Sequence, residues 1–224
     1  MEQYFEIILK NPLFTGISRE ELSSMLNCLS ATVIRVPKGE PVFLEGDAAG
    51  FVGLVLEGGV QIVRDDYFGN RTMLGLAEEG DIFAESYATA GVEIMPVSGY
   101  ALRNSRVMLL ECRKMLTVCS NACGFHNRLV KNLLQMMSRK NLQLSRKIQF
   151  MSQKTTKDKL MAYLLDQAKQ KGSAEFTIPL DRQTLADYLG VERSAMSAEL
   201  SKLRQAGVLE CKGSWFRLLK SEDA

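Results

Sequence analysis

The chain has 224 residues, of which 46% are hydrophobic and 24% charged, with a net charge of +2; these values fit one large or two small globular domains. No apolar run approaches the ~20 residues of a membrane span, and the N-terminus lacks the features of a signal peptide, so we expect a cytoplasmic protein with no membrane partner. The five cysteines are odd in number and fit no disulfide framework, which favours a reducing compartment.

The charge is unevenly distributed between the two halves of the chain. Residues 1–125 carry 10 Lys and Arg against 16 Asp and Glu, a net charge of −6, whereas residues 126–224 carry 18 against 10, a net charge of +8. A sign difference of this size indicates an anionic partner for the C-terminal half. The alternative is a basic surface that is only solvated.

Glycines punctuate short runs with β character between residues 32 and 111, among them TVIRV, PVFLE, FVGLVL, VQIV and RTMLGL. Short strands at intervals of roughly 8–12 residues predict an antiparallel sandwich or barrel. DDYFGN has the composition of a hairpin tip, and YALRNSRVMLLE reads as a later strand. Ahead of this block, Ser18 and Glu21 form a capping box that opens a short helix.

The next segment, 119–151, has no glycine after Gly124 and no proline, which favours a long helix. Along it runs a series with spacings of four and three, which we call the seam: Val130, Leu134, Met137, Asn141, Leu144, Ile148 and Met151. With one Asn at an a position over three heptads, the seam predicts a parallel homodimeric coiled coil. The alternative is an amphipathic helix that packs on its own domain.

Residues 152–224 predict a winged helix-turn-helix. TTKDKLMAYLLDQAKQKG reads as a helix that ends at Gly172 and EFTIPL as a strand; DRQTLADYLG and VERSAMSAELSKLRQAG read as two helices, and VLECKGSWFRLL as a hairpin about Lys212-Gly213. Gly190 permits the sharp turn between the paired helices.

The second of these paired helices is expected to meet DNA with its N-terminal end. Its apolar positions hold it on the core, so Arg193, Ser194, Ser197 and Ala198 face outward, where a recognition helix reaches base edges. Arg193 suits a guanine edge, and serine suits either base type. Other side chains suit backbone phosphates: Arg182, Gln183, Lys202 and Lys212. A winged helix that contacts only protein is the alternative.

Four stretches, in this order, resemble the Crp/Fnr family of bacterial transcription regulators: GEPVFLEGDAAGFVGLVLEGGVQIV, GDIFAES, the long helix, and DRQTLADYLGVERSAMSAELSKLRQAGVLE. The resemblance implies an α+β chain with an N-terminal β-roll (jelly-roll) sensory domain over residues 1–118, a dimerisation helix over 119–151 and a winged helix-turn-helix DNA-binding domain over 152–224. It also implies a homodimer that places two recognition helices about 34 Å apart on a palindrome in double-stranded DNA, and that contacts RNA polymerase if it is an activator. Ser194 and Ala198 replace a glutamate and an arginine common in the family, so its operator should differ.

The resemblance places a tentative effector pocket at Glu85, Ser86, Pro96, Val97 and Ser98. Cyclic-nucleotide binders of the family use a glutamate for the ribose and an Arg-Ser pair for the phosphate. Glu85 matches the glutamate, with Ala84 in place of the usual glycine, but Val97 stands where the arginine would be. Because a buried phosphate without a cation lacks its charge-assisted partner, we expect an effector other than cyclic AMP, or a pocket filled by its own side chains. Glu85 is alternatively a structural carboxylate.

CSNACGFH places Cys119, Cys123 and His126 on one face of a helix, where two thiolates and an imidazole can converge on a soft metal. Structural packing, thiol redox sensing and a metal or haem site are all open interpretations, and no metal or cofactor is assigned.

The combined prediction is a sequence-specific DNA-binding transcription regulator controlled by an unidentified effector. A ligand-binding or redox-sensing module whose basic half contacts partners other than DNA is the alternative. An enzyme is not expected, because the chain has one histidine and no recognisable catalytic set.

Overall fold

A computed structural model describes residues 2–68, 71–117 and 124–219. The chain divides into two compact units, Met1–Ser138 and Arg139–Ala224. Among the described residues, none of the helices combines the length and apolar character of a membrane span.

The N-terminal unit opens with four short helices: η1 (Glu2–Tyr4), α1 (Phe5–Lys10), η2 (Pro12–Phe14) and α2 (Arg19–Cys28). The predicted capping box is confirmed, because the Ser18 hydroxyl accepts from the Glu21 N–H at 3.2 Å and the Glu21 carboxylate accepts from the Ser18 N–H at 2.9 Å. Apolar residues of these helices share one core with the strand residues Val52 and Leu54.

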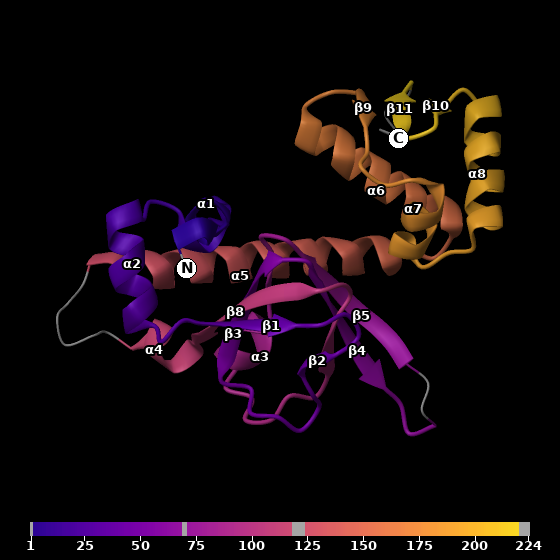
Figure 1. The fold of residues 1–224 in the computed structure, drawn as a ribbon. Helices are drawn as coiled ribbons and strands as arrows, with labels where there is room; N and C mark the ends of the chain where they lie inside the picture. Colours follow the sequence, from indigo (N-terminus) through magenta and orange to yellow (C-terminus); the bar gives the residue numbers. More distant parts are fainter. Residues whose placement is uncertain (1, 69–70, 118–123, 220–224) are drawn as a thin grey trace. The chain divides into compact units, whose positions relative to one another are not determined.

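Two four-stranded antiparallel sheets form the β-roll of this unit (Figure 1). One sheet has the order β1-β8-β3-β6 and the other β2-β7-β4-β5, which confirms the predicted antiparallel sandwich. β4 and β5 pair as antiparallel neighbours on either side of the hairpin tip predicted at DDYFGN, of which residues 69–70 lie outside the described residues. The bounds are β1 (Thr32–Val36), β2 (Pro41–Phe43), β3 (Phe51–Glu57), β4 (Gly59–Asp65), β5 (Arg71–Glu78), β6 (Ile82–Phe83), β7 (Ser98–Ala101) and β8 (Ser105–Glu111), with helices α3 (Glu85–Thr89) and α4 (Cys112–Leu116).

The prediction of one strand over YALRNSRVMLLE is wrong. The segment forms two strands, and β7 and β8 belong to different sheets. Polar bonds hold the corner between them: Arg103 donates to the Gly58 carbonyl at 2.7 Å, and the Asn104 side chain accepts from the Lys38 N–H at 3.0 Å. These bonds satisfy backbone groups of Gly58 and Lys38, which lie between strands.

Phenylalanine side chains fill the interior of the β-roll. Phe43 and Phe83 stack with ring centroids 6.1 Å apart, and Phe51 meets Phe43 edge-on at 5.6 Å. Two glycines lie against these rings: a Cβ at Gly53 would fall 2.1 Å from Phe83, and a Cβ at Gly99 would fall 2.3 Å from Phe43. The strands can approach the rings this closely only where no side chain intervenes.

Gly53→Ala is therefore expected to destabilise the N-terminal unit by about 1–3 kcal/mol, because the added methyl group forces the Phe83 ring from its place. Urea unfolding followed by circular dichroism measures the change. Gly75→Ala is the matched control on β5, since a Cβ there would meet nothing within 4 Å. Equal stability of the two variants would contradict the packing described.

The helix α5 (Gly124–Met151) begins in the N-terminal unit and ends in the C-terminal unit; the start predicted at Cys119 lies outside the described residues. The remaining elements follow the predicted winged helix-turn-helix order. They are α6 (Thr156–Lys171), β9 (Glu175–Thr177), α7 (Arg182–Leu189), α8 (Arg193–Gln205), β10 (Leu209–Lys212) and β11 (Trp215–Leu218), with sheet order β10-β11-β9. Gly172 and Gly190 end α6 and α7 in the left-handed conformation, at φ 62° and 61°.

Candidate nucleic-acid interface

The helix pair α7–α8 is fixed by apolar side chains on its inner side. Leu185 and Leu189 of α7 and Met196 and Leu200 of α8 are all buried in one core. The turn between the helices is closed by the Val191 N–H, which donates to the Ala186 carbonyl at 3.0 Å. This packing determines which side of α8 faces outward.

The N-terminal end of α8 is exposed at each position predicted to face outward: Arg193, Ser194, Ser197 and Ala198. The Ser197 hydroxyl donates to the Arg193 carbonyl at 2.8 Å. This bond uses the hydroxyl hydrogen, and the oxygen keeps lone pairs that can accept from a base edge. That these side chains read bases stays a prediction.

Arg182 lies at the first turn of α7 and packs against β11. Its guanidinium carbon is 4.7 Å from the centroid of the buried Phe216 ring on β11. Its buried Nη1 has no hydrogen-bond partner among the described residues. A guanidinium that is held in one orientation by stacking, and that always carries its charge, is suited to a phosphate contact. The support from Phe216 had no signal in the sequence, because the two residues are distant in the chain.

The other predicted phosphate contacts differ in their surroundings. The Gln183 amide donates to the Asp187 carboxylate at 2.9 Å. The Lys202 Nζ lies 2.6 Å from the Glu199 Oε1. This ion pair neutralises part of the lysine charge in the free protein. Lys212 is exposed at the end of β10. Of the four predicted phosphate contacts, Arg182 is therefore the one whose charged group is held most firmly in place.

Asp181, which was not among the predicted residues, caps α7. Its carboxylate accepts from the Thr184 N–H at 2.8 Å. This backbone bond holds the pKa of Asp181 below its ordinary value. Ser, Thr, Asp or Asn just before a helix is the sequence signal that identifies such a cap.

Most seam residues are uncovered in the single chain. Leu134, Leu144 and Ile148 are 67%, 61% and 66% exposed. Val130, Asn141 and Met151 are also exposed, whereas Met137 is half-buried against the N-terminal core.

A second apolar face of α5 packs inward. Leu129 and Leu133 lie in the N-terminal core, and Phe150 lies in the C-terminal core. The alternative of a helix packed on its own domain is therefore true of this second face, which is distinct from the seam.

The tentative effector residues do not share one environment. Val97 lies in the buried core that contains Phe43 and Phe83. Glu85 is also buried, whereas Ser86 and Pro96 are exposed.

Ser98 and Ala84 each have a distinctive local structure beside these residues. The Ser98 hydroxyl accepts from the Glu45 N–H at 2.9 Å, so it already holds a backbone partner. Ala84, in place of the usual glycine, adopts φ 63°, a region that favours glycine.

The predicted cluster of Cys119, Cys123 and His126 cannot be placed, because both cysteines lie outside the described residues. His126 itself is buried, and its Nε2 lies 3.8 Å from the Sγ of Cys28. Within the described ranges, no group of three or more His, Cys, Asp or Glu is arranged to hold a metal ion. The pairing of His126 with Cys28, 98 positions away, had no signal in the sequence.

Cys112 is expected to react more slowly with iodoacetamide at pH 8 than the half-exposed Cys211. Cys112 is only 3% exposed, and burial raises the pKa of its thiol, so the reactive thiolate is scarce. Timed alkylation followed by peptide mass spectrometry measures both rates in one sample. Equal rates would show that the N-terminal core opens freely.

Two domain families match the chain in the order of its two units. Residues 33–122 match the cyclic nucleotide-binding domain, and residues 158–222 match the Crp-like helix-turn-helix domain. Together they cover more than half of the chain.

Several regulators are similar to most of the chain. The transcriptional activator protein FnrA of Stutzerimonas stutzeri is 23% identical over 189 residues, 82% of this chain and 75% of its own length. The cyclic AMP receptor protein of Thermus thermophilus is 24% identical over 199 residues, 89% of this chain and 88% of its own.

A solved structure supports the fold. The global regulator CLP of Xanthomonas campestris, described as responsive to c-di-GMP, has a TM-score of 0.52 at 19% identity, over 89% of this chain and all of that one. The names of these proteins point to different signals, so the similarity does not identify an effector. Both domain matches and the relatives agree, and the chain belongs to the Crp/Fnr family of DNA-binding transcription regulators.

Proposed function

We propose that the protein acts as a homodimer, joined along the seam, that binds a palindromic operator with its two α8 helices. The exposed seam is the observation that carries this proposal. A stripe that includes Leu134, Leu144 and Ile148, each more than 60% exposed, is unfavourable in water and is stabilised when it is buried against a second copy.

The polar member of the seam supports the parallel arrangement. Asn141 is exposed, and its side-chain oxygen accepts from the Ser145 hydroxyl at 3.4 Å. In a parallel dimer two copies of Asn141 would face each other and hydrogen-bond, which fixes the register at some cost in stability. A parallel pair also places both α8 helices at the same end of the dimer, as an inverted repeat requires.

The proposed contacts with each half-site come from α8 and its surroundings. Arg193, Ser194 and Ser197 would read base edges, while Arg182 would bind a phosphate. The net charge of +8 on residues 126–224 supports an anionic partner of this kind. If the operator lies beside a promoter, RNA polymerase would be the second partner; the proposed location is the cytoplasm, and no catalytic role is proposed.

The proposed effector is not a cyclic nucleotide. Val97 brings no charge to the β-roll interior, and Phe43 and Phe83 occupy that interior. A cyclic phosphate would have to displace apolar side chains without gaining a cationic partner.

Selection from a random DNA library tests the proposal. The expected result is an inverted repeat with half-sites about one helical turn apart, bound by two chains per duplex in sedimentation experiments, with an affinity that cyclic AMP leaves unchanged. Recovery of a single unpaired half-site bound by one chain would contradict the dimer. A gain in affinity with cyclic AMP would contradict the account of the β-roll.

A further inference from the structure

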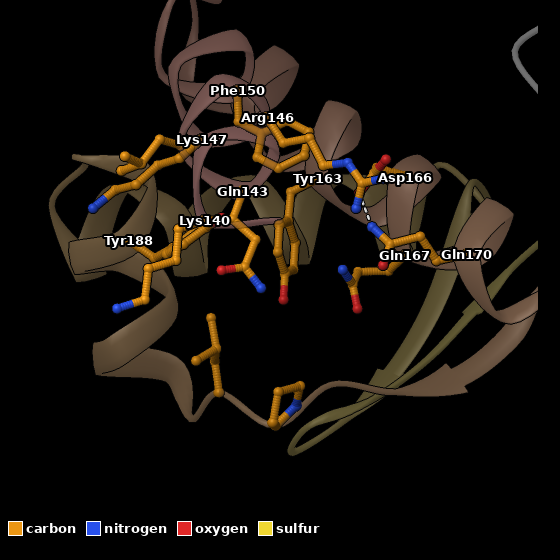
Figure 2. Close-up of a pocket in the computed structure, with 13 residues that line it drawn as sticks. Lys140, Gln143, Arg146, Lys147, Phe150, Tyr163, Asp166, Gln167, Gln170 and Tyr188 are labelled. Carbon is orange, nitrogen blue, oxygen red and sulfur yellow. Dashed lines mark hydrogen bonds between the residues drawn. The ribbon is translucent and has the colours of Figure 1, made fainter. Parts of the chain in front are cut away.

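A pocket of about 590 Å³ lies within the C-terminal unit (Figure 2). It is lined by the end of α5, by α6, by the segment that precedes α7, and by Tyr188 of α7. Its volume falls in the range of small-molecule sites, roughly 300–1,000 Å³. Apart from the seam residue Leu144, none of its lining residues belongs to the seam or to the predicted DNA contacts.

Three aromatic rings give the pocket an apolar wall. Phe150 meets Tyr163 edge-on at 5.7 Å and 89°, and Tyr163 meets Tyr188 at 5.7 Å and 62°. Pro179 and Leu180 add aliphatic surface. Ring edges and faces of this kind favour a flat, apolar ligand group.

The hydroxyl of Tyr163 is a donor that faces the pocket and has no hydrogen-bond partner among the described residues. Tyr163 is only 4% exposed, and its hydroxyl forms no hydrogen bond with any of the described residues. Figure 2 shows the hydroxyl pointing into the pocket, between the side-chain amides of Gln143 and Gln167. Burial raises the pKa of Tyr163 to about 12, so the group stays an O–H donor at neutral pH. A ligand oxygen would satisfy it.

Cationic side chains outnumber acidic ones around this donor. Lys140, Arg146 and Lys147 line the pocket against the single carboxylate of Asp166, which itself accepts a hydrogen bond from Gln170. The Lys147 ammonium lies 5.2 Å from the centroid of the Tyr188 ring. A positive rim above an apolar wall favours an amphipathic anion.

We propose that this pocket binds a small anion that carries a flat apolar ring. The ring would lie against Phe150, Tyr163 and Tyr188, and an acceptor oxygen would receive the Tyr163 hydroxyl. The anionic group, a carboxylate or a phosphate, would lie near Lys147. This site goes beyond the proposed function, because dimerisation and operator binding need no ligand here.

Calorimetric titration of the full-length protein with benzoate and with phenyl phosphate tests the site, with benzyl alcohol as the neutral probe. Both anions are expected to bind at least tenfold more tightly than the alcohol, and the tighter of the two identifies the preferred head group. Tyr163→Phe, which keeps the ring, is expected to weaken anion binding about tenfold, as loss of a hydrogen bond to a charged group does. Lys147→Gln should weaken it as well. Lys171→Gln removes a charge outside the pocket and should leave it unchanged.

Three outcomes would overturn the proposal: equal affinity for benzyl alcohol and the anions, undiminished affinity in Tyr163→Phe, or no binding of either anion at about 10 mM, where so small a fragment should bind. Thermal unfolding by circular dichroism checks that Tyr163→Phe folds. The operator affinity of Tyr163→Phe without ligand should equal that of the wild type, so a failure of this site would leave the proposed function standing.

Discussion

Leu134→Lys combined with Ile148→Lys is expected to convert the protein to monomers and to lower operator affinity by roughly 10²–10⁴-fold. Both side chains are more than 60% exposed in the single chain, so the substitutions should not disturb its own core. In a parallel dimer, however, each lysine would face its own copy across the seam, where apolar contact is replaced by like-charge repulsion. Without the dimer, the second half-site no longer benefits from an effective local concentration. Analytical ultracentrifugation and DNA titration measure the two effects.

Leu142→Lys is the matched control for that variant. Leu142 lies on the same helix and is 60% exposed, but it lies outside the seam. A single added lysine at this position should leave both dimerisation and operator affinity close to the wild type. If Leu142→Lys dissociates the protein as fully as the double variant, the seam is not the dimer contact.

Arg193→Met is expected to weaken binding to the selected operator by about 1–3 kcal/mol, or roughly 5–150-fold, and to relax the preference at one base pair of each half-site. Methionine keeps an aliphatic stem but lacks the paired donors that bond a guanine edge. Because Arg193 is exposed at the first turn of α8, the core of the helix pair is not affected. Competition titrations against single-base variants of the operator measure the loss and locate the base pair.

Arg182→Met gives the contrasting result expected of a phosphate contact. It should weaken binding to specific and unrelated sequences about equally, and lower the slope of log affinity against log salt by about 1. If Arg193→Met behaves in this uniform way and Arg182→Met changes base preference, the two assignments must be exchanged.

The C-terminal unit could be predicted largely from local signals. Gly172 and Gly190 mark helix ends through the left-handed conformation they adopt, and apolar spacing fixes the inner side of α8. The exposed seam was predictable for the same reason, since a heptad repeat is a local pattern. Its inward-packing neighbours, Leu133 and Phe150, were not identified, because which face of α5 packs on its own chain depends on tertiary contacts.

The features that sequence reasoning did not find depend on residues far apart in the chain. YALRNSRVMLLE divides between two sheets at a corner where Arg103 donates to the Gly58 carbonyl and Asn104 accepts from the Lys38 N–H. The filled β-roll interior rests on the packing of Phe43 with Phe83, although the loss of charge at Val97 had already disfavoured a phosphate there. The pocket beside Tyr163 joins three helices and the segment that precedes α7, and its lining residues form no distinctive motif in the sequence.

The most direct test of the central claim is a comparison of two duplexes at increasing salt, one with the full inverted repeat and one with a single half-site replaced. If a dimer reads DNA through its two α8 helices, the affinity should fall roughly 10²–10⁴-fold when one half-site is replaced. The affinity should also fall about 10³-fold or more between about 50 and 200 mM salt if six or more phosphates are contacted. Equal affinity for both duplexes, with little dependence on salt, would contradict the account.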